Sequence, residues 1–125
     1  QEKGILKISM PTLQGLEILP KNRDSYKDSL IGSFNKTKSS MGSRRLKEFF
    51  CNPSADFLEI KKRQDLVAYL LDHLEDLEGI RELLNEVRDL ERIMAKASSK
   101  KITSQDLLNA SQSIEIYFKI SKIIR

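Results

Sequence analysis

The sequence predicts a mainly α-helical protein: a multi-helix body with a short β or extended arm at its N-terminus and a long helix at its C-terminus. Apolar residues recur every three or four positions in most segments after residue 24, which is typical of helices with one buried face. Ser, Thr or Asp stands before several of these segments as a candidate cap. The 125 residues include only five glycines and three prolines. This length predicts a single domain, residues 1–125.

The N-terminal residues 1–20 differ from the rest. Residues 4–10 alternate partly and are rich in β-forming side chains, and Pro11 interrupts them before further apolar positions lead to Pro20. This pattern favours one or two short strands or an extended arm. After a polar loop, Tyr26 to Phe34 follow a helical spacing, with Asp24 or Ser25 as the expected cap.

The stretch from Lys38 to Pro53 contains a small-residue turn, basic side chains and two phenylalanines. Ser39 or Ser40 can cap a short amphipathic helix here. The buried side of that helix is expected to carry Met41, Leu46, Phe49 and Phe50. Asn52-Pro53 should end it, because the residue before a proline is disfavoured in the α conformation.

Further helices follow in the second half of the chain. Asp56 and Glu59 form a capping-box-like start to a helix of four to five turns, and the acidic residues 74–78 suggest a joint after it. A shorter helix is expected around residues 80–87, with a break allowed at Gly79, which costs about 1 kcal/mol in a helix interior. Asp89 is expected to cap another short helix or to pair with Arg92.

Thr103 and Asp106 should open the last helix, residues 103–125. The pattern predicts one broad apolar side for this helix, and Ile116, Ile120 and Ile123 are expected to widen that side and to remain exposed. The members of the broad side are Leu107, Ala110, Ile114, Tyr117, Phe118, Ser121 and Ile124. No stop signal precedes Arg125, and the first residue is not methionine. We therefore expect an excised piece of a longer protein whose final helix runs on.

The sequence carries no pattern for catalysis or metal binding. There is no glycine-rich phosphate loop, nucleophile elbow or His-Glu-x-x-His pattern. The single cysteine, Cys51, is expected to fill apolar space, and the single histidine, His73, to lie at the surface or at a helix end. No catalytic, cofactor-binding or metal-binding residue is predicted, and this chain is not expected to be an enzyme. Without an apolar run long enough for a membrane span or a signal sequence, the chain is expected to be intracellular, with no membrane partner.

The positive charge is concentrated locally. The chain carries a net charge of +4, and residues 25–50 hold six basic and two acidic side chains. Such a block can bind nucleic acid, but solvated basic faces are common in proteins with other functions. The candidate DNA-facing residues are Lys36, Lys38, Arg44, Arg45 and Lys47, with Arg44 also a candidate structural anchor.

Several runs together resemble the third, core or lever, domain of the MutS family of DNA mismatch-repair proteins. Residues 12–18 are similar to Thr-x-x-Asn-Leu-Glu-Leu, and residues 37–47 to Thr-x-Thr-x-Met-Gly-x-Arg-x-Leu-Lys. Pro53, the Arg63 region and residues 89–93 follow in the family's order. Phe49 stands where the family usually has Trp. The matching signature residues are Thr12, Leu16, Glu17, Met41, Gly42, Arg44, Leu46, Pro53, Arg63, Asp89, Leu90, Glu91 and Arg92.

The resemblance implies a non-catalytic structural and allosteric domain. Its lever helices would link an ATPase domain to mismatch-reading and clamp domains, and the last helix would be the first lever, cut before the clamp. The full-length parent would use ATP and magnesium, bind duplex DNA containing mismatches and pair with another MutS-like subunit. Its location would be cytoplasmic in bacteria or nuclear in eukaryotes. A direct nucleic-acid-binding module and a helical protein-interaction scaffold remain the alternatives.

Overall fold

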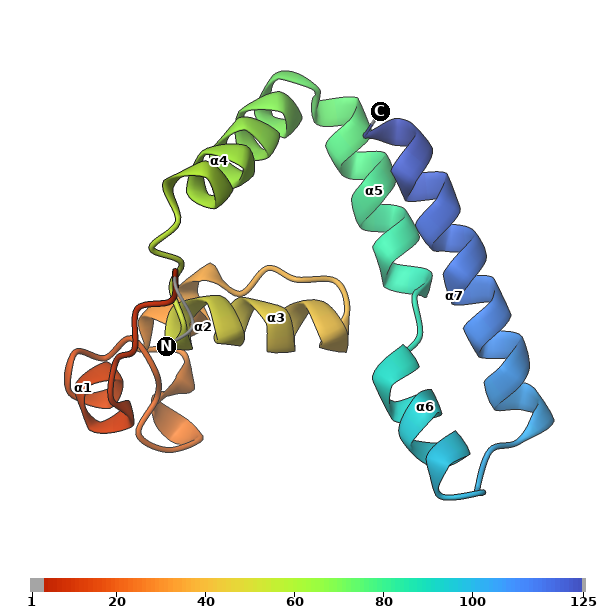
Figure 1. The fold of residues 1–125 in the computed structure, drawn as a ribbon, viewed down its shortest axis with the longest axis horizontal. Helices are drawn as coiled ribbons and strands as arrows, with labels where there is room; N and C mark the ends of the chain where they lie inside the picture. The colour runs from red at the N-terminus through yellow and green to blue at the C-terminus, as the bar shows by residue number, and fades with distance from the viewer. Residues whose placement is uncertain (1–3, 125) are drawn as a thin grey trace. The chain divides into compact units, whose positions relative to one another are not determined.

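The mainly α-helical class is confirmed by the computed structural model, which describes residues 4–124 (Figure 1). The described chain contains no strand, only an isolated antiparallel bridge between Ile5 and Ser54. The helices are α1 (Met10–Gly15), the 3-10 helix η1 (Asp24–Tyr26), α2 (Leu30–Phe34), α3 (Ser40–Cys51), α4 (Phe57–Asp72), α5 (Leu74–Glu86), α6 (Leu90–Ser98) and α7 (Ser104–Ile123).

These helices belong to two compact units. Among the described residues, unit 1 comprises residues 4–37 and 42–67, and unit 2 comprises residues 38–41 and 68–124, so α3 and α4 each contribute to both units. Each unit has its own buried residues.

The core of unit 1 is formed by Leu13, Leu19 and Ile31, which are at most 3% exposed. Leu46 and Phe50 of α3 pack against this cluster, as expected for the buried side of that helix. Cys51 also packs there, in agreement with its predicted role as an apolar filler.

The predicted N-terminal arm is extended only in its first part. Residues 6–9 lie outside any helix, and the Leu6 N–H donates to the Pro53 carbonyl oxygen at 2.9 Å. Residues 10–15, for which the sequence predicts strand or extended chain, instead form α1. Ser9 caps this helix through the Thr12 N–H, and Pro11 is tolerated near its start because the first N–H groups of a helix have no internal partner. The part of the prediction on residues 1–3 lies outside the described residues.

The helix expected from residues 24 to 34 is divided into η1 and α2. Ser29 causes the division: its hydroxyl donates to the Tyr26 carbonyl oxygen at 2.6 Å and accepts from the Gly32 N–H at 3.2 Å. Ser29, rather than Asp24 or Ser25, is therefore the cap of α2. A local hydroxyl bond of this kind competes with continuation of the preceding helix.

The helices α3 and α4 have the predicted bounds. α3 begins at Ser40 and ends at Cys51, before Asn52-Pro53. One Asp56 carboxylate oxygen accepts from the N–H groups of Leu58 and Glu59 at 2.8 and 3.4 Å, so Asp56 caps the first turn of α4.

The joint after α4 lies at His73, one residue before the acidic run in which the sequence predicts it. Residues 74–78 form the first turns of α5, and the helix continues through Gly79 without a break. The acidic side chains are favourable there because a helix N-terminus carries partial positive charge. His73 has φ of −125° and ψ of 68°, outside the helical range, so α4 and α5 are separate helices.

In unit 2, α5 and α6 both pack along α7 (Figure 1). Each of the three helices contributes one buried isoleucine: Ile80, Ile93 and Ile116 are 7%, 8% and 5% exposed. A 20-residue helix with two shorter partners along its length is therefore the main element of this unit.

Candidate functional site

The signature run at residues 37–47 forms the connector into α3 and its first two turns. Asn35, which sequence reasoning missed, holds this connector in place. Its amide nitrogen donates to the Tyr26 hydroxyl at 2.7 Å and to the Ser43 hydroxyl at 2.9 Å, and its amide oxygen accepts from the Thr37 hydroxyl at 2.7 Å. The four side chains come from η1, the connector and α3. In the sequence, only the two-residue spacing of Asn35 and Thr37 indicates part of this network, because such a spacing favours a local side-chain bond.

Phe49, two residues after this run, has two guanidinium groups near its ring. The Arg45 guanidinium lies 4.8 Å from the centre of the Phe49 ring and that of Arg63, on α4, lies 4.1 Å from it. Arg45 also pairs with Glu48, and Arg63 with Glu59. The prediction that Phe49 is buried is wrong: its side chain is 36% exposed and contacts both guanidinium groups, an arrangement called here the cation–π stack.

Replacement of Phe49 tests the stack. Phe49→Trp is expected to raise the stability of unit 1 by about 0.5 kcal/mol, because an indole attracts cations more strongly than a phenyl ring does. Phe49→Leu is expected to lower it by about 1 kcal/mol, since the apolar contact stays while both cation–π contacts are lost. Urea denaturation of the wild type and the two variants measures both changes. Equal midpoints for the wild type and Phe49→Leu would show that the stack contributes nothing.

The candidate DNA-facing residues do not share one environment. Lys36 and Lys47 are exposed in unit 1, and Lys38 is exposed in unit 2. Arg45 is exposed as well, but Glu48 and Phe49 occupy its guanidinium. A phosphate would have to compete with that carboxylate, so the lysines are the more accessible cations of this set.

The signature run at residues 89–92 begins α6. One Asp89 carboxylate oxygen accepts from the Arg92 N–H at 3.2 Å, which confirms the cap that the spacing predicted. The other oxygen accepts from the hydroxyl of Ser40, the first residue of α3, at 3.0 Å. Leu90 is half-buried, and Glu91 and Arg92 are exposed.

The remaining signature residues lie in unit 1, except Met41, which belongs to unit 2. The Thr12 hydroxyl bonds that of Ser9 at 2.7 Å, Leu16 ends α1, and Glu17 has a positive φ of 56°. The Glu17 carbonyl accepts from the Leu30 N–H at 2.8 Å, so this turn is fastened to α2. Met41 and Gly42 are half-buried and Arg44 is exposed. The anchoring role of Arg44 stays a prediction.

The start of α7 is a complete capping box. The Thr103 hydroxyl accepts from the Asp106 N–H at 3.2 Å, and the Asp106 carboxylate accepts from the Thr103 N–H at 3.1 Å. The Lys96 ammonium of α6 donates to the other carboxylate oxygen at 2.8 Å. These bonds, first the one from Lys96 and then those from Thr103, lower the pKa of Asp106 below its ordinary 3.8. The carboxylate thus joins the end of α6 to the start of α7.

Acid titration is expected to weaken this joint. Because the pKa of Asp106 is lower in the folded protein than the ordinary 3.8, its contribution to stability is complete above about pH 4 and is lost as the pH falls through the lower, folded value. In Asp106→Asn the free energy of unfolding should therefore fall less between pH 5 and pH 2. Urea unfolding at several pH values measures the slope. The same acid dependence in both proteins would contradict this assignment.

A second polar contact fastens α7 to the chain between α5 and α6. The Ser113 side chain is 2% exposed, and its hydroxyl accepts from the Arg88 N–H at 2.9 Å while donating to the Asn109 carbonyl oxygen at 2.8 Å. The buried Ser113 hydroxyl therefore has both a donor and an acceptor partner, as buried polar groups usually do.

The expected exposure of Ile116, Ile120 and Ile123 is wrong. Ile116 is buried at 5% exposure and the other two are half-buried. The broad side contains the exposed residues instead: Leu107, Ile114, Tyr117 and Phe118 are between 49% and 65% exposed. The packed face includes polar residues, Asp106 and Ser113, whose hydrogen bonds make burial tolerable. Because Asp106 and Ser113 are polar, the sequence pattern does not identify their side of α7 as the buried one.

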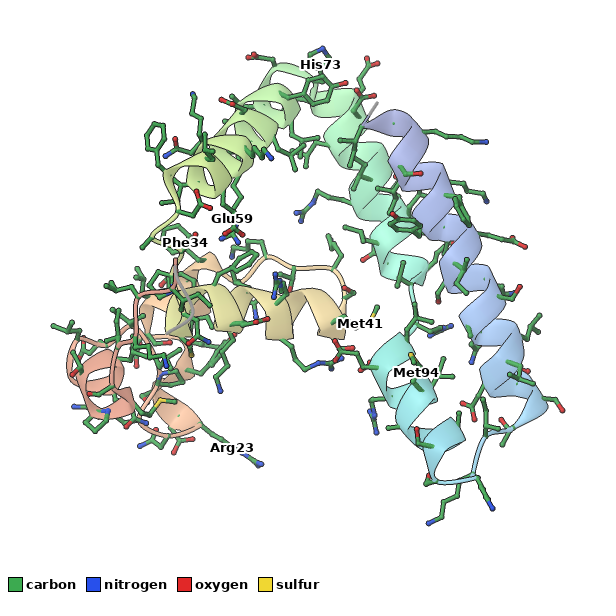
Figure 2. All side chains as sticks on the ribbon, in the orientation of Figure 1. Arg23, Phe34, Met41, Glu59, His73 and Met94 are labelled. Carbon is green, nitrogen blue, oxygen red and sulfur yellow. The ribbon has the colours of Figure 1, made fainter. Side chains whose placement is uncertain are left out.

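Among residues 4–124, no group of three or more His, Cys, Asp or Glu side chains could hold a metal ion. His73 lies at the turn between α4 and α5, as expected (Figure 2). Its ring stacks on that of Tyr69, with 4.2 Å between the ring centres. The Tyr69 hydroxyl donates to Asp76 at 3.1 Å, a bond that raises the pKa of the tyrosine. None of the described helices is long and apolar enough to cross a membrane.

The fold and these contacts define a helical domain in which helix starts and buried polar contacts position one long helix. Comparison with known proteins gives the family. The family model described as MutS domain III matches residues 11–125. This chain belongs to that family, and the resemblance read from its sequence is confirmed.

Individual relatives agree with the family. The chain is 38% identical over 115 residues to DNA mismatch repair protein MutS of Caldicellulosiruptor bescii. The aligned region covers 91% of this chain and 13% of the relative. It is 34% identical over 125 residues to the protein of the same name from Caldanaerobacter subterraneus, covering 99% of this chain and 14% of the relative. The chain thus spans about a seventh of these relatives. No solved structure matches it.

Proposed function

We propose that this chain is the non-catalytic core and lever domain of a MutS-like mismatch-repair ATPase. In the whole protein it would transmit the nucleotide state of an ATPase domain to the domains that read and clamp mismatched DNA. ATP and magnesium, mismatched duplex DNA and a second MutS-like subunit are the proposed cofactors and partners of that whole protein.

The observation that carries this proposal is the two-sided character of α7. One face is fixed by Ile116, Ser113 and Asp106 against the rest of unit 2. The other face leaves Leu107, Ile114, Tyr117 and Phe118 exposed. A helix held rigidly along one side, with an apolar second side, is suited to transmit displacement between packed elements.

The test uses the full-length protein with two exposed apolar residues of α7 made polar, Ile114→Ser and Phe118→Ser. We expect mismatch binding without nucleotide to stay within about twofold, and its change on adding ATP to shrink about tenfold, the usual size of an allosteric coupling. Lys119→Ser, on the same helix and also exposed, is the matched control and should behave as wild type. An unchanged ATP response in the double variant would overturn the lever proposal.

The direct nucleic-acid-binding alternative is supported by one observation, the exposure of Lys36, Lys38 and Lys47. Titration of this chain with duplex DNA, with and without a mismatch, at two salt concentrations separates the two functions. The lever proposal expects weak binding. Tight binding with a steep salt dependence, reduced in the triple Lys→Gln variant, would favour the alternative for this chain, because released counterions report phosphate contacts.

A further inference from the structure

We propose that Asp89 is a positioning residue shared by the starts of two helices, α3 and α6, and that it makes the start of α3 respond to displacement of α6. This inference rests on the proposed lever function and names a contact through which displacement would pass. It assigns one physical role to two signature runs, residues 37–47 and 89–93.

The geometry divides the two carboxylate oxygens between two helices. Oδ1 of Asp89 accepts from the Arg92 N–H at 3.2 Å, within α6. Oδ2 accepts from the Ser40 hydroxyl at 3.0 Å, across 49 positions of sequence. Ser40 and Asp89 belong to the same compact unit.

One carboxylate can serve both helices because their starts have the same electrostatic requirement. The first N–H groups of a helix have no internal acceptor and carry partial positive charge, which an anionic side chain stabilises. Hydrogen bonds weaken steeply with distance and angle. A small shift of α6 would therefore break the bond to Ser40 before it disturbed the local cap at Arg92.

The same helix connects Asp89 to α7. Ile93, four residues after Asp89, is 8% exposed and its N–H bonds the Asp89 carbonyl at 3.1 Å. Lys96, one turn further, pairs with Asp106 at the start of α7. The contacts thus run from α7 through Lys96 and Ile93 to Asp89, and from Asp89 to Ser40.

The experiment separates the two bonds by substitution at both ends. Asp89→Ser keeps a good cap for α6, since serine caps as well as aspartate, but its short neutral side chain cannot also serve Ser40. Ser40→Ala removes the same bond from the other end, and Ser40→Thr keeps the hydroxyl. Amide hydrogen exchange of the full-length protein, free of nucleotide and DNA, is read in peptides from residues 38–46 and 90–97.

We expect Asp89→Ser and Ser40→Ala each to speed exchange at the start of α3 about tenfold, with exchange in α6 within about twofold of wild type and with Ser40→Thr close to wild type. Equal speeding of exchange in both helices would indicate general unfolding and overturn the shared contact, as would wild-type exchange at α3 in Asp89→Ser.

A second measurement tests the response itself. Adding ATP should change the exchange rate at the start of α3 in wild type and in Ser40→Thr. In Asp89→Ser and Ser40→Ala this ATP-induced change should be at least about fivefold smaller. An ATP response at α3 that survives both variants would overturn the positioning role. Exchange is also read in α7, residues 104–123. If α7 responds to ATP and the start of α3 never does, the lever function stands and this inference fails. If neither responds in wild type, both fail.

Discussion

Gly32→Ala is expected to destabilise unit 1 by about 3 kcal/mol, the upper range for overpacking in a closely packed site. A Cβ at this position would lie 1.9 Å from the Tyr26 carbonyl oxygen and 2.8 Å from its carbon. That oxygen accepts hydrogen bonds from both the N–H and the hydroxyl of Ser29. The backbone of η1 cannot move aside without breaking the bonds that start α2.

The matched control is Gly15→Ala in the same unit. A Cβ on Gly15 would meet nothing within 4 Å. This substitution should leave stability unchanged or raise it by up to about 1 kcal/mol, because alanine restricts the unfolded chain. Urea denaturation gives the midpoint for each variant. A midpoint for Gly32→Ala equal to that of Gly15→Ala would contradict the close approach at Tyr26.

Ile116→Ala is expected to cost unit 2 about 3 kcal/mol, because it leaves a cavity where α7 packs. Ile116 is 5% exposed in the described chain. The loss should appear as a lower denaturation midpoint with little change in the denaturant dependence. Faster amide exchange in α5 and α6 should accompany it, since both helices pack on α7.

The same substitution two residues away is the control. Ile114 is 49% exposed, and Ile114→Ala should cost less than about 1 kcal/mol in this chain. The two variants lose the same atoms and gain the same helix propensity, so their difference reports burial alone. Equal losses would mean that the two faces of α7 are not distinct.

The helix starts show how much of this protein local sequence predicts. Asp56, Asp89 and the Thr103–Asp106 pair are predicted as caps from spacing and hold those positions in the structure. Each of these bonds joins residues two or three positions apart, so the order of residue types is sufficient to predict it. The end of α3 at Asn52-Pro53 follows in the same way from the conformational restriction before proline.

The sequence pattern predicted secondary structure less well where a serine side chain bonds the backbone nearby. The Ser9 cap makes residues 10–15 helical despite a strand-like start, and the Ser29 hydroxyl divides one periodic segment into two short helices. Both serines are visible in the sequence. Their effect depends on which of several nearby caps is used, and packing of Leu13 and Ile31 in one core selects among them.

The sequence by itself determined the helical class, the starts of α3, α4, α6 and α7, and membership in the MutS domain III family, because these depend on near neighbours and on signature spacing. Only the tertiary structure decided which face of α7 is packed, since apolar residues occur on both sides and the buried side includes Asp106 and Ser113. It also decided the contacts between distant residues, such as Ser40 with Asp89 and Arg63 with Phe49. Such contacts depend on how whole helices meet, and no local spacing encodes them.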